Sequence, residues 1–147
     1  MVKTMRGRWA TAAMAMALVG TLFQSVLVGT VSAGAAAGDP VGVARSFYAT
    51  MGTNDYTDAA RLVDPTSDLR DNVLGLRREN WRALTTRSYE LVQFTTVASD
   101  GNTAKVVVTG PVMHTTTDGR QFEFWVYAET NLVEKGGRWL ITAASDY

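Results

Sequence analysis

Residues 121–141 read QFEFWVYAETNLVEKGGRWLI, and this run predicts two antiparallel strands around a two-residue turn at Gly136-Gly137. Aromatic and β-branched side chains, which favour strands, dominate it. The pattern extends from Tyr89 to Tyr147, where Asp-Gly pairs at 100–101 and 118–119 separate two further apolar runs. We therefore predict four antiparallel strands, over residues 89–98, 103–115, 120–134 and 138–145. The third strand is long enough that we expect a bulge near Thr130-Asn131.

The residues before the strands predict helices, which a curled sheet needs in order to bury one of its faces. Asp39 and Pro40 are typical of an N-cap and a first helical residue, and Gly52 is typical of a helix end. The spacing of apolar residues predicts a second helix over residues 56–63 and a third over residues 68–86. The expected fold class is α+β, with N-terminal helices packed on a curved antiparallel sheet of four or more strands.

The N-terminal segment has the composition of an export signal. Its only charged residues are Lys3, Arg6 and Arg8, and a run without any charge follows from Trp9 to Gly38. Within this run, Val31-Ser32-Ala33 is the small-x-small pattern that signal peptidase accepts. An uncleaved membrane anchor is the alternative, because the uncharged run is long enough for a span of roughly 20 residues.

Both interpretations place the domain outside the cytoplasm, because the basic end of such a segment stays inside. We expect a signal peptide or an uncleaved anchor over residues 1–33, a linker over residues 34–40 and one domain over residues 41–147. The protein would then be secreted, or held in the cytoplasmic membrane with its domain outside. A membrane contact is expected only if the leader is retained.

The composition of the remaining residues excludes several functional classes. After Gly38 the chain carries eleven basic and fourteen acidic residues, a net charge of −3, which argues against nucleic-acid binding. The absence of cysteine excludes disulfides, a thiol nucleophile and cysteine-ligated metals. The single histidine and the absence of phosphate-loop and calcium-loop patterns predict no metal and no cofactor.

Two segments resemble the nuclear transport factor 2-like (NTF2-like, or SnoaL-like) superfamily. Residues 47–62, FYATMGTNDYTDAARL, are similar to its first helices, and residues 132–141, LVEKGGRWLI, are similar to its last hairpin. The resemblance extends over residues 41–147 and implies a cone in which helices and a curved sheet enclose a pocket. It implies little about activity, since the superfamily includes isomerases, dehydratases, binding modules and exported bacterial domains of no known activity.

The turns also predict which side chains share a face of the sheet. If the three turns are two-residue loops, directly opposed residues lie on one face. One face is then apolar and is expected to pack on the helices, with Val92, Phe94, Val107, Met113, Phe122, Phe124, Val126, Trp139 and Ile141. The other face is amphipathic, with Tyr89, Gln93, Thr95, Val108, His114, Glu123, Trp125, Tyr127 and Glu129.

This register predicts an apolar pocket and a separate interface. Given the resemblance, the pocket between helices and sheet would be lined by side chains without a general acid or base, namely Phe47, Tyr48, Trp81, Phe94, Met113, Phe122 and Phe124. Trp125 and Tyr127 on the other face are typical of a protein interface, and a homodimer through the sheet face is one expectation. We therefore expect a non-catalytic domain, exported or membrane-tethered, that binds a small apolar ligand or a protein partner.

A shifted register leaves an enzyme as the alternative. It would place His114, Glu123, Tyr127 and Asp146 inside the pocket, where His114 with a carboxylate could transfer protons as isomerases and dehydratases do. Tyr48 resembles the tyrosine that isomerases of the superfamily take from their first helix, but their carboxylate base has no counterpart in these strands. The two hypotheses differ in whether His114 points into the cone.

Overall fold

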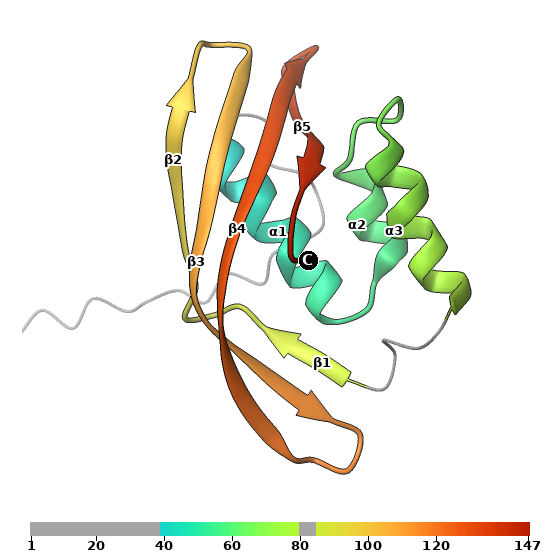
Figure 1. The fold of residues 1–147 in the computed structure, drawn as a ribbon. Helices are drawn as coiled ribbons and strands as arrows, with labels where there is room; N and C mark the ends of the chain where they lie inside the picture. Colours follow the sequence, from blue (N-terminus) through green and yellow to red (C-terminus); the bar gives the residue numbers. More distant parts are fainter. Residues whose placement is uncertain (1–38, 80–84) are drawn as a thin grey trace, which may run out of the picture. The chain divides into compact units, whose positions relative to one another are not determined.

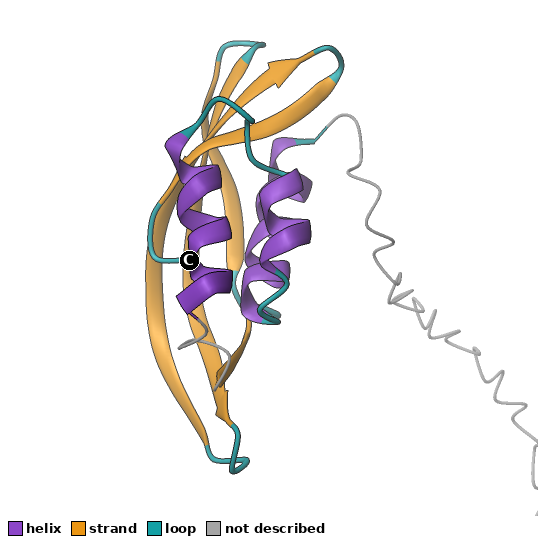
Figure 2. Cartoon of the chain, turned by 90° about the vertical axis from the view of Figure 1, so that its right-hand side faces the viewer, coloured by secondary structure: helices purple, strands orange, loops and turns teal. Residues whose placement is uncertain are grey.

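The computed structural model describes residues 39–79 and 85–147, in which three helices precede five strands (Figure 1). The helices are α1 (Pro40–Gly52), α2 (Tyr56–Arg61) and α3 (Asp68–Glu79). The strands form one antiparallel sheet, with the bounds β1 (Thr85–Ser88), β2 (Gln93–Ser99), β3 (Thr103–Thr116), β4 (Gln121–Lys135) and β5 (Arg138–Ala144). The helices cover one face of the curled sheet (Figure 2), so the predicted α+β class is confirmed.

The predicted signal peptide or anchor and most of the predicted linker lie outside the described residues. Within the described residues, no helix is both long enough and apolar enough to cross a membrane. The export of this chain therefore stays a prediction from the composition of its first residues.

The first two helices begin where the sequence predicts. The Asp39 carboxylate accepts hydrogen bonds from the Val41 and Gly42 amides, at 3.0 and 3.2 Å, and Pro40 follows as the first helical residue. The Asp55 carboxylate caps α2 in the same way. The apolar stripe of α1 is buried against the sheet and forms part of one continuous core.

The third helix is shorter than predicted. The structure describes α3 as far as Glu79, and residues 85–88, of which the helical spacing assigns the first two to the same helix, form β1 instead. Thr85 of β1 lies opposite Thr116 of β3. Backbone pairing with a neighbouring strand outweighs the weak helix propensity of a segment with two adjacent threonines. The predicted first strand is also shorter, since Tyr89 is buried in the turn before β2.

β3 pairs with three other strands. β4 lies along one of its edges, while β1 and β2 share the other edge. The chain passes from β1 to β2 beside Gly110, whose φ is +139° and where a Cβ atom would lie 3.1 Å from the Val92 Cα, so a side chain would be strained there. The outer edge of β5 is partly covered by the connection between α2 and α3, because the Asp64 amide donates to Ile141 O at 2.8 Å.

The turn between β3 and β4 has one residue more than predicted. The Thr116 amide donates to Arg120 O at 2.9 Å and Gly119 has a φ of +81°, so the loop spans three residues, 117–119. His114 consequently lies opposite Phe122. A shift of one residue turns every side chain of a strand to the other face, so the predicted faces of β3 are exchanged.

The helix-facing side of β3 is therefore built from other residues than predicted. Val106, Val108 and Val112 are buried on this side, and His114 shares it. Val107, Met113 and Glu123 lie on the opposite side. On β4 and β5 the predicted faces hold, since the helix-facing side carries Phe122, Phe124, Val126, Trp139 and Ile141.

The other two turns and the predicted bulge agree with the sequence-based predictions only in part. The Gly136-Gly137 turn has two residues, as predicted, with φ values of +61° and +80°. The turn between β2 and β3 has two residues but is displaced by one, because the Asp100 amide donates to Thr103 O at 3.1 Å and the loop is therefore 101–102 instead of 100–101. The pairing of β4 with β5 shifts between residues 131 and 132, where the bulge is predicted, with Thr142 of β5 as the extra residue.

Candidate functional site

Two of the seven predicted pocket residues belong to the core. Phe47 and Tyr48 are fully buried, and their rings pack edge to face with centroids 5.5 Å apart. The Tyr48 hydroxyl donates to Ser145 O at 2.8 Å and lies 3.3 Å from Thr130 Oγ1. Burial raises the pKa of the Tyr48 phenol to about 12, so the group stays protonated. These contacts of both side chains are internal to the fold.

The other predicted pocket residues are spread over different parts of the fold. Phe94 is half-buried, and the guanidinium carbon of Arg45 lies 5.4 Å from its ring centre. Met113 lies on the opposite side of the sheet, and Trp81 lies outside the described residues. The two that remain exposed on the helix-facing side of the sheet are Phe122 and Phe124.

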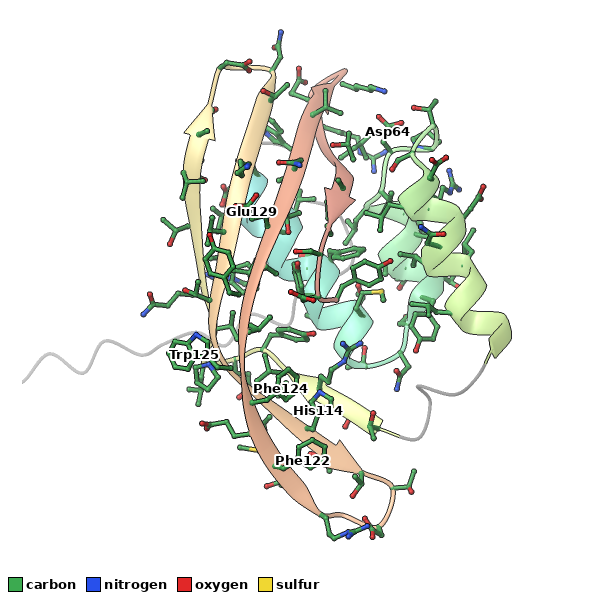
Figure 3. All side chains as sticks on the ribbon, in the orientation of Figure 1. Asp64, His114, Phe122, Phe124, Trp125 and Glu129 are labelled. Atoms are coloured by element: carbon green, nitrogen blue, oxygen red, sulfur yellow. The ribbon has the colours of Figure 1, made fainter. Side chains whose placement is uncertain are left out.

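An aromatic cluster lies on the part of the β3–β4 hairpin that β5 does not reach (Figure 3). The His114 imidazole centre lies 5.0 Å from the Phe122 ring and 4.3 Å from the Phe124 ring. The phenylalanines are 49% and 37% exposed, so the cluster presents an apolar surface to solvent. Arg87 of β1 lies opposite His114. We call these four residues the hairpin patch: Arg87, His114, Phe122 and Phe124.

Two buried polar atoms of the hairpin patch have no hydrogen-bond partner in the described part of the chain, His114 Nε2 and Arg87 Nη2. Most buried donors in proteins are paired, because an unpaired one costs about 1–3 kcal/mol. Burial, and then the charge of Arg87, lower the pKa of the His114 imidazole, which is therefore neutral near pH 7. The patch thus combines a guanidinium charge, a neutral imidazole and two phenyl rings.

The predicted catalytic partners of His114 lie elsewhere. Glu123 is on the opposite side of the sheet. Asp146 follows the end of β5, which reaches Glu129 of β4, and Glu129 is seven residues, or roughly 23 Å of strand, from Phe122. No carboxylate of the described residues contributes to the pKa of His114. These two carboxylates therefore do not form an acid–base pair with the imidazole.

The outer side of the sheet carries a second exposed aromatic surface. Trp125 and Tyr127 lie there, as predicted, and are 72% and 61% exposed. Figure 3 shows Trp125 on the opposite side of the hairpin from Phe124. This surface is therefore separate from the hairpin patch, although both use the same strand.

A shallow groove of about 320 Å³ lies between the start of α3 and β5. Its lining is mostly small or polar, which does not fit the predicted apolar ligand, and consists of Ser67, Asp68, Leu69, Asn72, Thr142, Ala143, Ala144 and Tyr147. A metal site is not indicated either, because the described residues contain no group of three or more metal-ligating side chains.

No protein-family model and no curated protein matches this sequence. An uncharacterised protein with a cystatin-like fold from Caulobacter vibrioides is 17% identical, with a TM-score of 0.51 over 69% of this chain and 81% of that chain. Aln2 from a Streptomyces species is 17% identical, with a TM-score of 0.52 over 73% and 90% of the two chains. A Catenulispora acidiphila protein in complex with S-DNPA is 15% identical, with a TM-score of 0.52 over 69% and 84%. These similarities show a shared cone-like fold.

Proposed function

We propose that this chain is a non-catalytic binding domain of the nuclear transport factor 2-like kind that takes a small apolar ligand on the hairpin patch. The observation that carries the proposal is the pair of exposed rings, Phe122 and Phe124, beside an imidazole nitrogen without a hydrogen-bond partner in the described part of the chain. Small-molecule sites combine apolar walls with a few polar groups, which is the composition of this patch. The complex of the Catenulispora acidiphila protein with S-DNPA supports a small ligand in this fold.

A binding role fits the hairpin patch better than catalysis does. The predicted proton transfer by His114 uses a carboxylate that orients the imidazole or takes part in a second proton transfer. Of the two carboxylates that the sequence offers for this task, Glu123 lies on the opposite side of the sheet and Asp146 lies far along it from the imidazole. A neutral histidine between two phenyl rings can instead recognise a ligand through one hydrogen bond.

Titration with the neutral apolar fluorophore N-phenyl-1-naphthylamine tests this proposal. We expect saturable binding to the native protein and about 10-fold to 30-fold weaker binding to the Phe122→Ala/Phe124→Ala double variant. The reason is that covering the exposed half of each ring contributes roughly 1 kcal/mol. Tyr127→Ala is the matched control, because it removes an exposed ring from the opposite side of the same strand. An equal loss in this control, or no saturable binding to the native protein, contradicts the proposal.

We also propose that the domain works outside the cytoplasm, either exported or tethered by its N-terminal segment. The basic start and the uncharged run that contains Val31-Ser32-Ala33 support this. The intact mass of the protein in soluble and membrane fractions of a secreting bacterial host provides the test. A soluble species that begins near Gly34 indicates a free exported domain, and a full-length species confined to membranes indicates a tether. A full-length cytoplasmic species contradicts both.

The outer side of the sheet supports a second role, contact with a protein partner. Trp125 and Tyr127 are the most exposed aromatic side chains of the described residues, and aromatic side chains are enriched at protein interfaces. The partner we propose is a second copy of this chain. Sedimentation velocity should then show a dimer that Trp125→Ser converts to a monomer, whereas a native monomer at high concentration contradicts the idea.

A further inference from the structure

We infer that the ligand of the hairpin patch is an organic anion, an apolar or aromatic body that carries a carboxylate. This inference rests on the proposed function, because it names the chemical class of the ligand that the patch binds. The inference is based on two polar atoms, Arg87 Nη2 and His114 Nε2. Both atoms are buried and have no hydrogen-bond partner in the described part of the chain.

The two atoms belong to side chains that are neighbours on one side of the sheet. Arg87 and His114 are directly opposed across β1 and β3, and paired Cα atoms in such a ladder lie about 4.5–5.5 Å apart. A guanidinium always donates, and a neutral imidazole donates when its proton is on Nε2. Two donors on adjacent strands match the two oxygens of a carboxylate, and hydrogen bonds to a charged acceptor are stronger than neutral ones.

The charge of Arg87 has no counter-charge among the described residues. The ion pairs found there involve other side chains, namely Asp58–Arg61, Lys105–Glu129, Asp118–Arg120 and Asp64–Lys135. A partly buried guanidinium without a counter-ion is unfavourable, and a bound anion removes this cost. A neutral ligand leaves the charge uncompensated, so the patch favours an anionic one.

The phenyl rings define the apolar part of the ligand. Phe122 and Phe124 contact the imidazole with one part of their surface and solvent with the rest. Exposed side chains change rotamer within picoseconds to nanoseconds, so these rings can move to admit a carboxylate to the two buried nitrogen atoms. They can then pack against the ligand body in offset or edge-to-face geometry. The hairpin patch therefore combines two buried nitrogen atoms with exposed aromatic surface.

Isothermal titration calorimetry with 2-naphthoate and its neutral methyl ester tests the inference, on the protein as recovered from a secreting host at pH 7. We expect the native protein to bind the acid about 10-fold more tightly than the ester, or more, because only the acid forms charge-assisted hydrogen bonds. Arg87→Met keeps the aliphatic stem and should bind acid and ester equally, with an unchanged affinity for the ester. Arg120→Met is the matched control, since it removes an exposed arginine from the same hairpin and should keep the preference.

The outcomes separate this inference from the proposed function. Equal affinity of the native protein for acid and ester overturns the anion but leaves an apolar binding site. Binding of neither probe overturns the site and the anion together. A preference that survives Arg87→Met, or that disappears in Arg120→Met, overturns the assignment to Arg87. If Arg87→Met does not fold, as judged by circular dichroism, His114→Phe must lower the preference at least about 3-fold, and an unchanged preference contradicts the inference.

Discussion

Gly52 ends α1, as the sequence predicts, but glycine is required there for contact and not for a left-handed cap. The cap residue is Thr53, which has a negative φ. A Cβ atom on Gly52 would overlap the Arg87 carbonyl oxygen, so glycine lets α1 approach β1 closely. This one residue therefore helps to set the position of the strand that carries the guanidinium of the hairpin patch.

For this single residue we predict that Gly52→Ala lowers the free energy of unfolding by about 1–3 kcal/mol, because either the backbone of β1 or the end of α1 must shift. Urea denaturation measures the effect. Gly75→Ala is the control, since its Cβ meets nothing within 4 Å in α3, and it should raise the free energy of unfolding by about 0.5–1 kcal/mol. A Gly52→Ala variant that is no less stable than the native protein would show that the close approach of α1 to β1 does not matter.

Among the elements, the turn between β3 and β4 determines the site. An Asp-Gly pair fits a two-residue loop, but a glycine with positive φ also closes a three-residue loop, and residues 117–119 form the latter. The extra residue brings His114 to the side of Phe122 and leaves Glu123 on the other side, whereas the pairing of β3 with β1 places Arg87 opposite His114. Loop length and strand pairing together thus convert a predicted outer-face histidine into part of the hairpin patch.

From the register of β3 we predict that truncating two adjacent valines changes the stability of the fold by different amounts. Val108 is fully buried, whereas Val107 is half-buried on the outer side. Val108→Ala should lower the free energy of unfolding by about 1.5–3 kcal/mol, and Val107→Ala by less than about 1 kcal/mol, in urea denaturation. The two-residue loop requires the reverse order, so a larger effect at Val107 would restore the register predicted from the turns.

At the scale of the whole domain, an ion pair between a buried carboxylate and a half-exposed lysine connects the helices to the last hairpin of the sheet. The Asp64 side chain, which is 3% exposed, lies in the connection between α2 and α3 and pairs with Lys135 Nζ at 2.5 Å. It also accepts from the amide and the hydroxyl of Thr66, at 2.9 and 2.7 Å. The bond to Lys135, and then those to Thr66, lower the pKa of the Asp64 carboxyl from 3.8 to about 2.

A lowered folded-state pKa means that the stabilisation by Asp64 is complete above about pH 4 and is lost as the pH falls through about 2. We expect Asp64→Asn to lower the unfolding temperature at pH 7 and to flatten its decrease between pH 4 and pH 2. Thermal unfolding followed by circular dichroism provides the measurement. Asp58→Asn, which removes an exposed pair with Arg61, is the control and should keep the acid-dependent decrease. An unchanged decrease in Asp64→Asn would rule out this linkage.

Local chemistry was sufficient for much of the fold. The Asp39 cap, the apolar stripe of α1 and the aromatic run of β4 act within a few residues, so composition and spacing predict them, and the α+β class follows. The existence of β1 could not be predicted in this way. It depends on pairing with Thr116 and its neighbours, which lie far away in the sequence.

The same distinction between local and long-range interactions applies to the residues of the candidate site. The amino-acid sequence alone placed Phe122 and Phe124 on the helix-facing side of β4 and Trp125 and Tyr127 on the other, because alternation within one strand is a local property. Tertiary structure determined that Arg87 and His114 join the phenylalanines. Their positions depend on a loop length and a strand pairing, and since side chains alternate with a period of two, one residue in a turn exchanges the faces of a whole strand.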